Sequence, residues 1–153
     1  MTNFTDSNRG LLRRRRLASV RSAEEVDYHI FKDVAGLKEE YEHSIRILSL
    51  FGDKRGIGNQ HGNIANALNR MSRYAEALEN YKIALAIADE VGNVKGVINQ
   101  HVGISVVLLE KKEFAAALEW ATKGATIASN FGDRQWSTYL RSLAEEASNS
   151  LRD

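Results

Sequence analysis

The sequence has neither proline nor cysteine among its 153 residues, and it has no long apolar run. Without proline, no helix interior in the chain loses a backbone donor or suffers the steric clash that proline introduces. Without cysteine, disulfides, thiol catalysis and cysteine-ligated metals are excluded. No apolar run approaches the roughly 18 residues of a membrane span, and no apolar core of a secretory signal is recognisable. We therefore expect a helical, cytoplasmic protein.

The net charge of +1 conceals an uneven distribution of charge along the chain. Residues 1–21 contain six arginines and one acid, a net of +5, whereas residues 22–153 contain 15 bases and 19 acids, a net of −4. The length suffices for one domain with a hydrophobic core. We expect a disordered or frayed arm at residues 1–12 and a single domain at residues 13–153.

A short phrase recurs every 40 residues: Phe51-Gly52-Asp53, Val91-Gly92-Asn93 and Phe131-Gly132-Asp133. Residues 51–90 aligned without gaps on 91–130 give 13 identities in 40 positions. A fixed period of this length is the signature of a solenoid, in which similar units stack on one another. In each phrase the glycine can end one helix in a left-handed conformation, and the following Asp or Asn can cap the next helix.

Apolar residues spaced three and four apart predict helices between these joints. Helical hairpins are expected at about 13–50, 54–90 and 94–130, with helix 13–31 weakly patterned and helix 34–50 clearly so. A last helix at about 134–151 has one apolar and one polar face, as a terminal cap requires. We expect it to bury Trp136, Leu140 and Leu143. The prediction is all-α, with seven helices in one right-handed array.

Tyr74 and Phe114 are each followed by Ala-Leu at the same spacing, and the first segment continues with Tyr81 and Ala84. Both segments resemble the tetratricopeptide repeat. Residues 62–68 are similar to the Asn-Leu-Gly-Asn-Ala-Tyr segment of long 40-residue variants, the Pins/LGN-type scaffolds and kinesin light chain. The resemblance covers about 34–150. It implies an α-solenoid of about three hairpins plus a capping helix, and a non-enzymatic scaffold that binds a peptide or protein segment in its concave groove.

Asparagines in the first helix of each hairpin are the candidate binding residues. Asn59, Asn63 and Asn66 share one helical face because they are three or four residues apart. An amide both donates and accepts hydrogen bonds, which suits a peptide backbone. The resemblance implies this role for Asn63 and Asn66, and the alternative is a solvated polar face. The full predicted groove comprises Asn59, Asn63, Asn66, Asn69, Arg70, Asn99, Val102 and Val106. Gly103 and Val106 replace the asparagines in the later repeat.

Two other patterns leave alternatives open. His61 and His101 repeat at 40 residues, but neighbouring hairpins are too far apart for one zinc ion to bind both, so packing is the favoured interpretation and no metal or other cofactor is expected. The run Arg13, Arg14, Arg15 and Arg16 could contact nucleic acid or an anionic membrane surface, belong to an organelle-targeting segment, or be a solvated helix start.

No catalytic arrangement is recognisable, so an enzyme is not expected. Gly56 and Gly58 lie within a helix rather than in a phosphate-binding loop after a strand. The expected partner is another protein or peptide, with no small-molecule substrate. A homodimer through an open end of the solenoid is a further expectation. The alternative function is an adaptor that binds nucleic acid or membrane through the basic arm.

Overall fold

The computed structural model describes residues 23–152, and its regular elements there are all helices, so the predicted all-α fold is confirmed. The sequence predicted seven helices, whereas the described residues contain six. These are α2 (Ala23–Phe51), α3 (Lys54–Arg70), α4 (Tyr74–Glu90), α5 (Val94–Glu110), α6 (Phe114–Phe131) and α7 (Arg134–Ser150). Side chains are described from Val34 onward, where the compact unit that carries the repeats begins.

The joints between hairpins have the predicted chemistry. A left-handed glycine ends each preceding helix, with φ of +67°, +66° and +83° at Gly52, Gly92 and Gly132. Glycine reaches this conformation without the steric penalty that a side chain would add. The next residue caps the following helix by accepting a hydrogen bond from the backbone N–H three residues on, at 2.9–3.1 Å, as seen in Asp53, Asn93 and Asp133.

The first predicted hairpin differs from the structure. A helix ending near residue 31 and another beginning at 34 were expected, but α2 continues without a break from Ala23 to Phe51. The sequence Lys32-Asp33 supplies no glycine to end a helix there, unlike the three Gly-Asp or Gly-Asn joints. The rest of the predicted hairpin and the arm at 1–12 lie outside the described residues.

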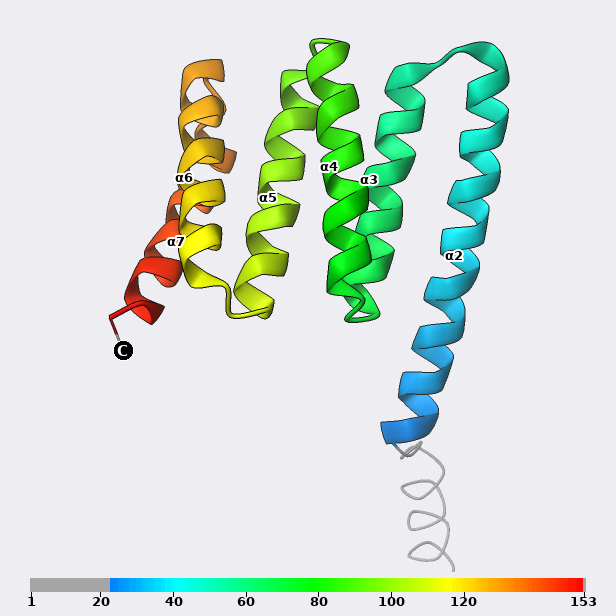
Figure 1. Ribbon diagram of the computed structural model, residues 1–153, viewed down its shortest axis with the longest axis horizontal. Coiled ribbons are helices and arrows are strands. Elements are labelled where there is room, and N and C mark those ends of the chain that lie inside the picture. Colours follow the sequence, from blue (N-terminus) through cyan, green and yellow to red (C-terminus); the bar gives the residue numbers. More distant parts are fainter. Residues whose placement is uncertain (1–22, 153) are drawn as a thin grey trace, which may run out of the picture. The chain divides into compact units, whose positions relative to one another are not determined.

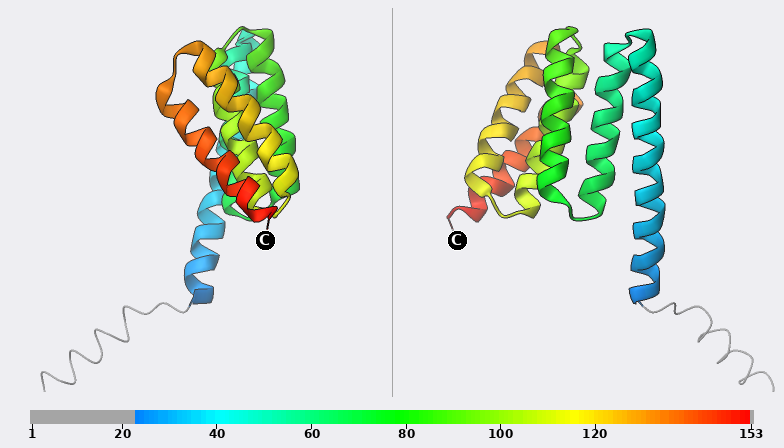
Figure 2. Two further views of the ribbon diagram at one scale, coloured as in Figure 1. Left: turned by 90° about the vertical axis from the view of Figure 1, so that its left-hand side faces the viewer. Right: turned by 45° about the vertical axis from the view of Figure 1, so that its right-hand side comes forward.

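The helices from α3 to α7 pack in sequence order, each against the next (Figures 1 and 2). Consecutive helices run in opposite directions because short turns join them. The first helices of the units also meet: α3 contacts α5, and α5 contacts α7. One face of the array is therefore built from α3, α5 and α7.

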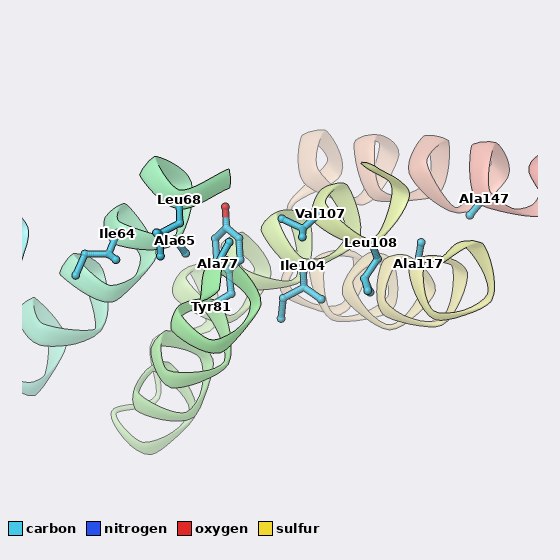
Figure 3. Packing of buried hydrophobic residues seen from close by; sticks show 10 residues of the cluster. All are labelled: Ile64, Ala65, Leu68, Ala77, Tyr81, Ile104, Val107, Leu108, Ala117 and Ala147. Carbon is cyan, nitrogen blue, oxygen red and sulfur yellow. The ribbon is translucent and has the colours of Figure 1, made fainter. Parts of the chain in front are cut away.

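The core continues from one hairpin into the next (Figure 3). Leu68 of α3 and Ile104 of α5 are fully buried, and Tyr81 of α4 lies between the two helices (Figure 3). Alanines at the tightest positions, such as Ala77 and Ala117, let the helices approach closely. Burial of this kind, about 25 cal/mol per Å² of apolar surface, is what holds the helices together.

The terminal helix α7 only partly follows the prediction. Leu140 and Leu143 are buried against α5 and α6 as expected. Trp136 is half-buried instead, so the prediction of a buried ring is wrong. It follows the Asp133 cap in the first turn of α7, where the helix has only begun to enter the core, and one side of its ring faces a groove.

Candidate functional site

A groove of about 680 Å³ runs along the face of α3 and α5 and ends at the start of α7. Side-chain amides form most of its polar lining, and Lys95 is the one charged side chain among its lining residues. Its large apolar lining residues beside Tyr81 are Val102, Val106 and Trp136. The amides belong to Asn59, Asn63, Asn66 and Asn69 of α3, Asn93 at the cap of α5, and Asn99 and Gln100 of α5.

Most of the predicted groove residues are brought together by the structure. Arg70 is the exception: it is exposed in the last turn of α3, one turn beyond Asn66, and it lies outside the lining. The residues that do line the groove are Asn59, Asn63, Asn66, Asn69, Asn99, Val102 and Val106. Their binding role remains a prediction.

Tyr81 is one of the groove residues that sequence reasoning missed, together with Asn93, Lys95, Gln100 and Trp136. Its spacing on α4 predicted a core residue, and the side chain is indeed 3% exposed. Its hydroxyl nevertheless reaches the groove, where it donates a 2.5 Å hydrogen bond to Oδ1 of Asn66 on α3. This bond fixes the orientation of the Asn66 amide, so Asn66 has a structural contact besides any contact with a partner.

Gly103 explains why the asparagine pattern breaks in the later repeat. A Cβ atom at this position would lie 2.4 Å from Cε1 of Tyr81, far inside van der Waals contact. Gly103 occupies the position equivalent to Asn63, so an asparagine there would collide with the ring. The sequence shows that a glycine replaces the asparagine at position 103. It does not show the reason, which is the contact with Tyr81 on α4.

Burial raises the pKa of Tyr81 to about 12, from an ordinary value of 10.0. The folded state therefore keeps this proton between about pH 10 and 12 while the unfolded chain releases it, and stability falls as the pH rises through this window. At about pH 11 the loss should be about 1 kcal/mol relative to about pH 9. Urea unfolding at the two pH values measures it. Tyr81→Phe should lack this component, and an equal decline in both proteins would contradict the assignment.

The close packing of α3 on α5 depends on Gly62. A Cβ at Gly62 would lie 3.3 Å from Nε2 of Gln100, so the absence of a side chain lets that amide pack across the helix pair. Gln100 is itself buried. In the same groove, Oδ1 of Asn69 is buried and has no hydrogen-bond partner among the described residues. The floor of the groove thus combines close helix packing with amide groups.

The two repeated histidines pack between helices, as the favoured interpretation held. His61 Nδ1 lies 2.9 Å from Oδ1 of Asn80 on α4. His101 is buried and donates a 2.9 Å hydrogen bond from Nδ1 to the carbonyl oxygen of Val97. The centroid of its ring lies 5.1 Å from the centroid of the Trp120 ring on α6. In the described part of the chain, no cluster of three or more His, Cys, Asp or Glu side chains is suited to holding a metal ion.

The arginine run Arg13–Arg16 lies outside the described residues, so the structure does not place it. Among the helices from residue 23 to 152, none combines the length and the apolar character that crossing a bilayer requires. The candidate site that the structure does define is the groove on α3 and α5.

The helices, joints and packing define an all-α array of repeated helical hairpins. The sequence model described as the tetratricopeptide repeat matches residues 58–130, which contain nearly all of the groove. This region belongs to the tetratricopeptide repeat family, as the sequence resemblance indicated. Repeats of this family typically have no catalytic role and generally mediate protein–protein interactions. No curated protein matches the chain as a relative.

Proposed function

We propose that this chain is a non-enzymatic scaffold that binds an extended segment of another protein in the groove of α3 and α5. The observation that carries the proposal is the continuous set of side-chain amides around a groove of about 680 Å³. Each amide offers both a donor and an acceptor, so together they match the alternating N–H and C=O groups of a peptide backbone. A groove that lacked such amides would leave the N–H and C=O groups of the bound backbone without hydrogen-bond partners.

The lining also supports a partner of particular composition. Val102, Val106 and Trp136 form an apolar wall, which favours an apolar side chain in the bound segment. Lys95 is the charged lining side chain, so an acidic residue is favoured near it and a basic one is disfavoured. The proposed ligand is therefore an extended segment with an apolar anchor and no excess of positive charge.

Peptides selected from a displayed random library on the intact chain provide the probe, and fluorescence anisotropy gives their affinity. Asn63→Ala should weaken binding about two- to tenfold, because one net hydrogen bond contributes about 0.5–1.5 kcal/mol. Trp136→Ala should weaken it at least about tenfold if the ring is the anchor. Asn66 is unsuitable for this test because its amide also accepts from Tyr81.

The matched control is Asn149→Ala, an asparagine exposed on α7 outside the groove lining. It should leave the affinity unchanged, and all three variants should keep helical circular dichroism. Unchanged affinity in both Asn63→Ala and Trp136→Ala would contradict binding in this groove. With a DNA oligonucleotide as the probe, binding that falls steeply with salt concentration would instead favour phosphate recognition by the basic arm.

A further inference from the structure

One flank of α2 is exposed although the equivalent flanks of α4 and α6 are covered. We call the residues Leu37, Glu40, Ser44, Ile47 and Phe51 the open flank of α2. Their equivalents on α4, 40 residues later, face α3. Asn80 pairs with His61 of α3, and Ile87 packs so closely on Gly58 that a Cβ there would lie 2.9 Å from Ile87 Cγ2.

The same position carries a small residue in all three helices: Ser44, Ala84 and Gly124. At Gly124 of α6, a Cβ would lie 2.7 Å from the Cβ of His101 on α5, so the first helix of that hairpin approaches closely there. The equivalent residue of α4, Ala84, is also closely covered, with only 1% of its surface exposed. Ser44 therefore marks the point on α2 where a covering helix can approach most closely.

In the described residues, no first helix covers this flank, and α2 from residue 34 to 51 has α3 on one side only (Figure 1). Leu37 is 37% exposed where its equivalents Ala77 and Ala117 are fully buried. Four of the eight large apolar side chains exposed in the described part lie on α2: Leu37, Ile47, Leu50 and Phe51. A cluster of this kind is typical of an interaction surface.

The upstream sequence is unsuited to cover the flank as a first helix of its own. In the 40-residue register, the buried residues Ile64 and Ala65 of α3 correspond to Glu24 and Glu25. Charged side chains at these core positions would be buried without a partner, which strongly disfavours such packing.

We infer that the open flank of α2 is covered by the same flank of a second copy of this chain, with the two α2 helices antiparallel about a two-fold axis at Ser44. A two-fold interface requires one self-complementary surface. Leu37 and Phe51 each lie seven residues from Ser44, two helical turns or about 10.5 Å on either side. Leu37 of each copy then meets Phe51 of the other.

The remaining pairs in this arrangement are also compatible. Ile47 and Glu40 of the second copy lie at nearly the same height and on the same side of the axis, so the methylene groups of Glu40 can pack on Ile47 while its carboxylate stays in water. The two Glu40 side chains are separated by eight residues, about 12 Å along the axis, a distance at which salt screens their repulsion.

Sedimentation equilibrium of the intact chain tests the dimer. A species of twice the 17.1 kDa chain mass is expected at micromolar concentration. The double variant Ile47→Glu/Phe51→Glu should shift it to the monomer by at least about a hundredfold in dissociation constant. The control is Phe131→Glu, at the equivalent joint two repeats later and 48% exposed, which should remain dimeric. Circular dichroism verifies that each variant is folded.

The absence of cysteine makes a direct test of the axis available. A two-fold axis brings a residue next to its own copy, so Ser44→Cys should form a covalent dimer on mild oxidation. Ser49→Cys, an exposed serine on the other side of α2, should not. A monomer at all concentrations up to about 100 μM would overturn the proposal. So would a dimer that survives the double variant, or one that Ser49→Cys crosslinks as well as Ser44→Cys.

Discussion

Leu140→Ala is expected to lower the free energy of unfolding by about 2–5 kcal/mol, the range for deleting a fully buried leucine side chain. Leu140 is 0% exposed and lies in the cluster with Ile98 of α5 and Ala125 of α6. Both of its terminal methyl groups would lie 3.1 Å from a Cβ built at Gly124, so its surroundings are tightly packed. Truncation therefore leaves a cavity where α7 meets two helices.

Urea unfolding followed by circular dichroism measures this change. Leu151→Ala is the control, because this leucine is 51% exposed at the end of α7 and should change stability by less than about 0.5 kcal/mol. Because repeat arrays are held together by contacts between neighbours, a loss of α7 packing should expose the C-terminal end first. A loss below about 1 kcal/mol for Leu140→Ala would show that α7 is not anchored by this residue.

Gly103→Ala is expected to destabilise the protein by about 1–3 kcal/mol, the usual range for overpacking a core. In an ordinary helix interior the same change stabilises by about 1 kcal/mol, because alanine favours the helix more than glycine does. Here the added Cβ would lie 2.4 Å from the Tyr81 ring. The ring is buried and its hydroxyl is bonded to Asn66, so it has little freedom to move away.

Gly36→Ala is the matched control for this prediction, because nothing lies within 4 Å of a Cβ built at Gly36 on α2. It should be neutral or stabilising by up to about 1 kcal/mol. Adding Tyr81→Ala to Gly103→Ala should remove the clash between the new Cβ and the ring. The double variant should therefore lose less unfolding free energy than the sum of the two single variants. Stabilisation by Gly103→Ala alone would refute the close contact with Tyr81.

The sequence by itself determined the repeat and its joints. The 40-residue period, the glycines and the capping residues predicted the helix ends at the three Gly-Asp or Gly-Asn joints to within one residue of the structure. These signals are local, since a left-handed glycine and a cap act on the backbone within one turn. The same period, with the aromatic and alanine spacing around Tyr74, indicated the family of residues 58–130.

The continuity of α2 was the first feature that only the structure decided. A change in the apolar pattern between residues 31 and 34 suggested a joint, but no stop signal is present there. Weak amphipathic patterning does not end a helix; a glycine, a proline or a competing cap does. In the described residues, no separate first helix lies beside the open flank of α2.

The sequence predicted some of the groove residues, and only the tertiary structure identified the others. Helical spacing placed the asparagines of α3 on one face, because that face is fixed by the period of a single helix. Tyr81, Gly103 and Trp136 could not be assigned in the same manner, because their positions depend on neighbouring helices. The ring of Tyr81 reaches the groove only because Gly103 on α5 leaves space for it. Such packing between helices is a tertiary property. In the sequence its only trace is Gly103, and the reason for that glycine cannot be seen there.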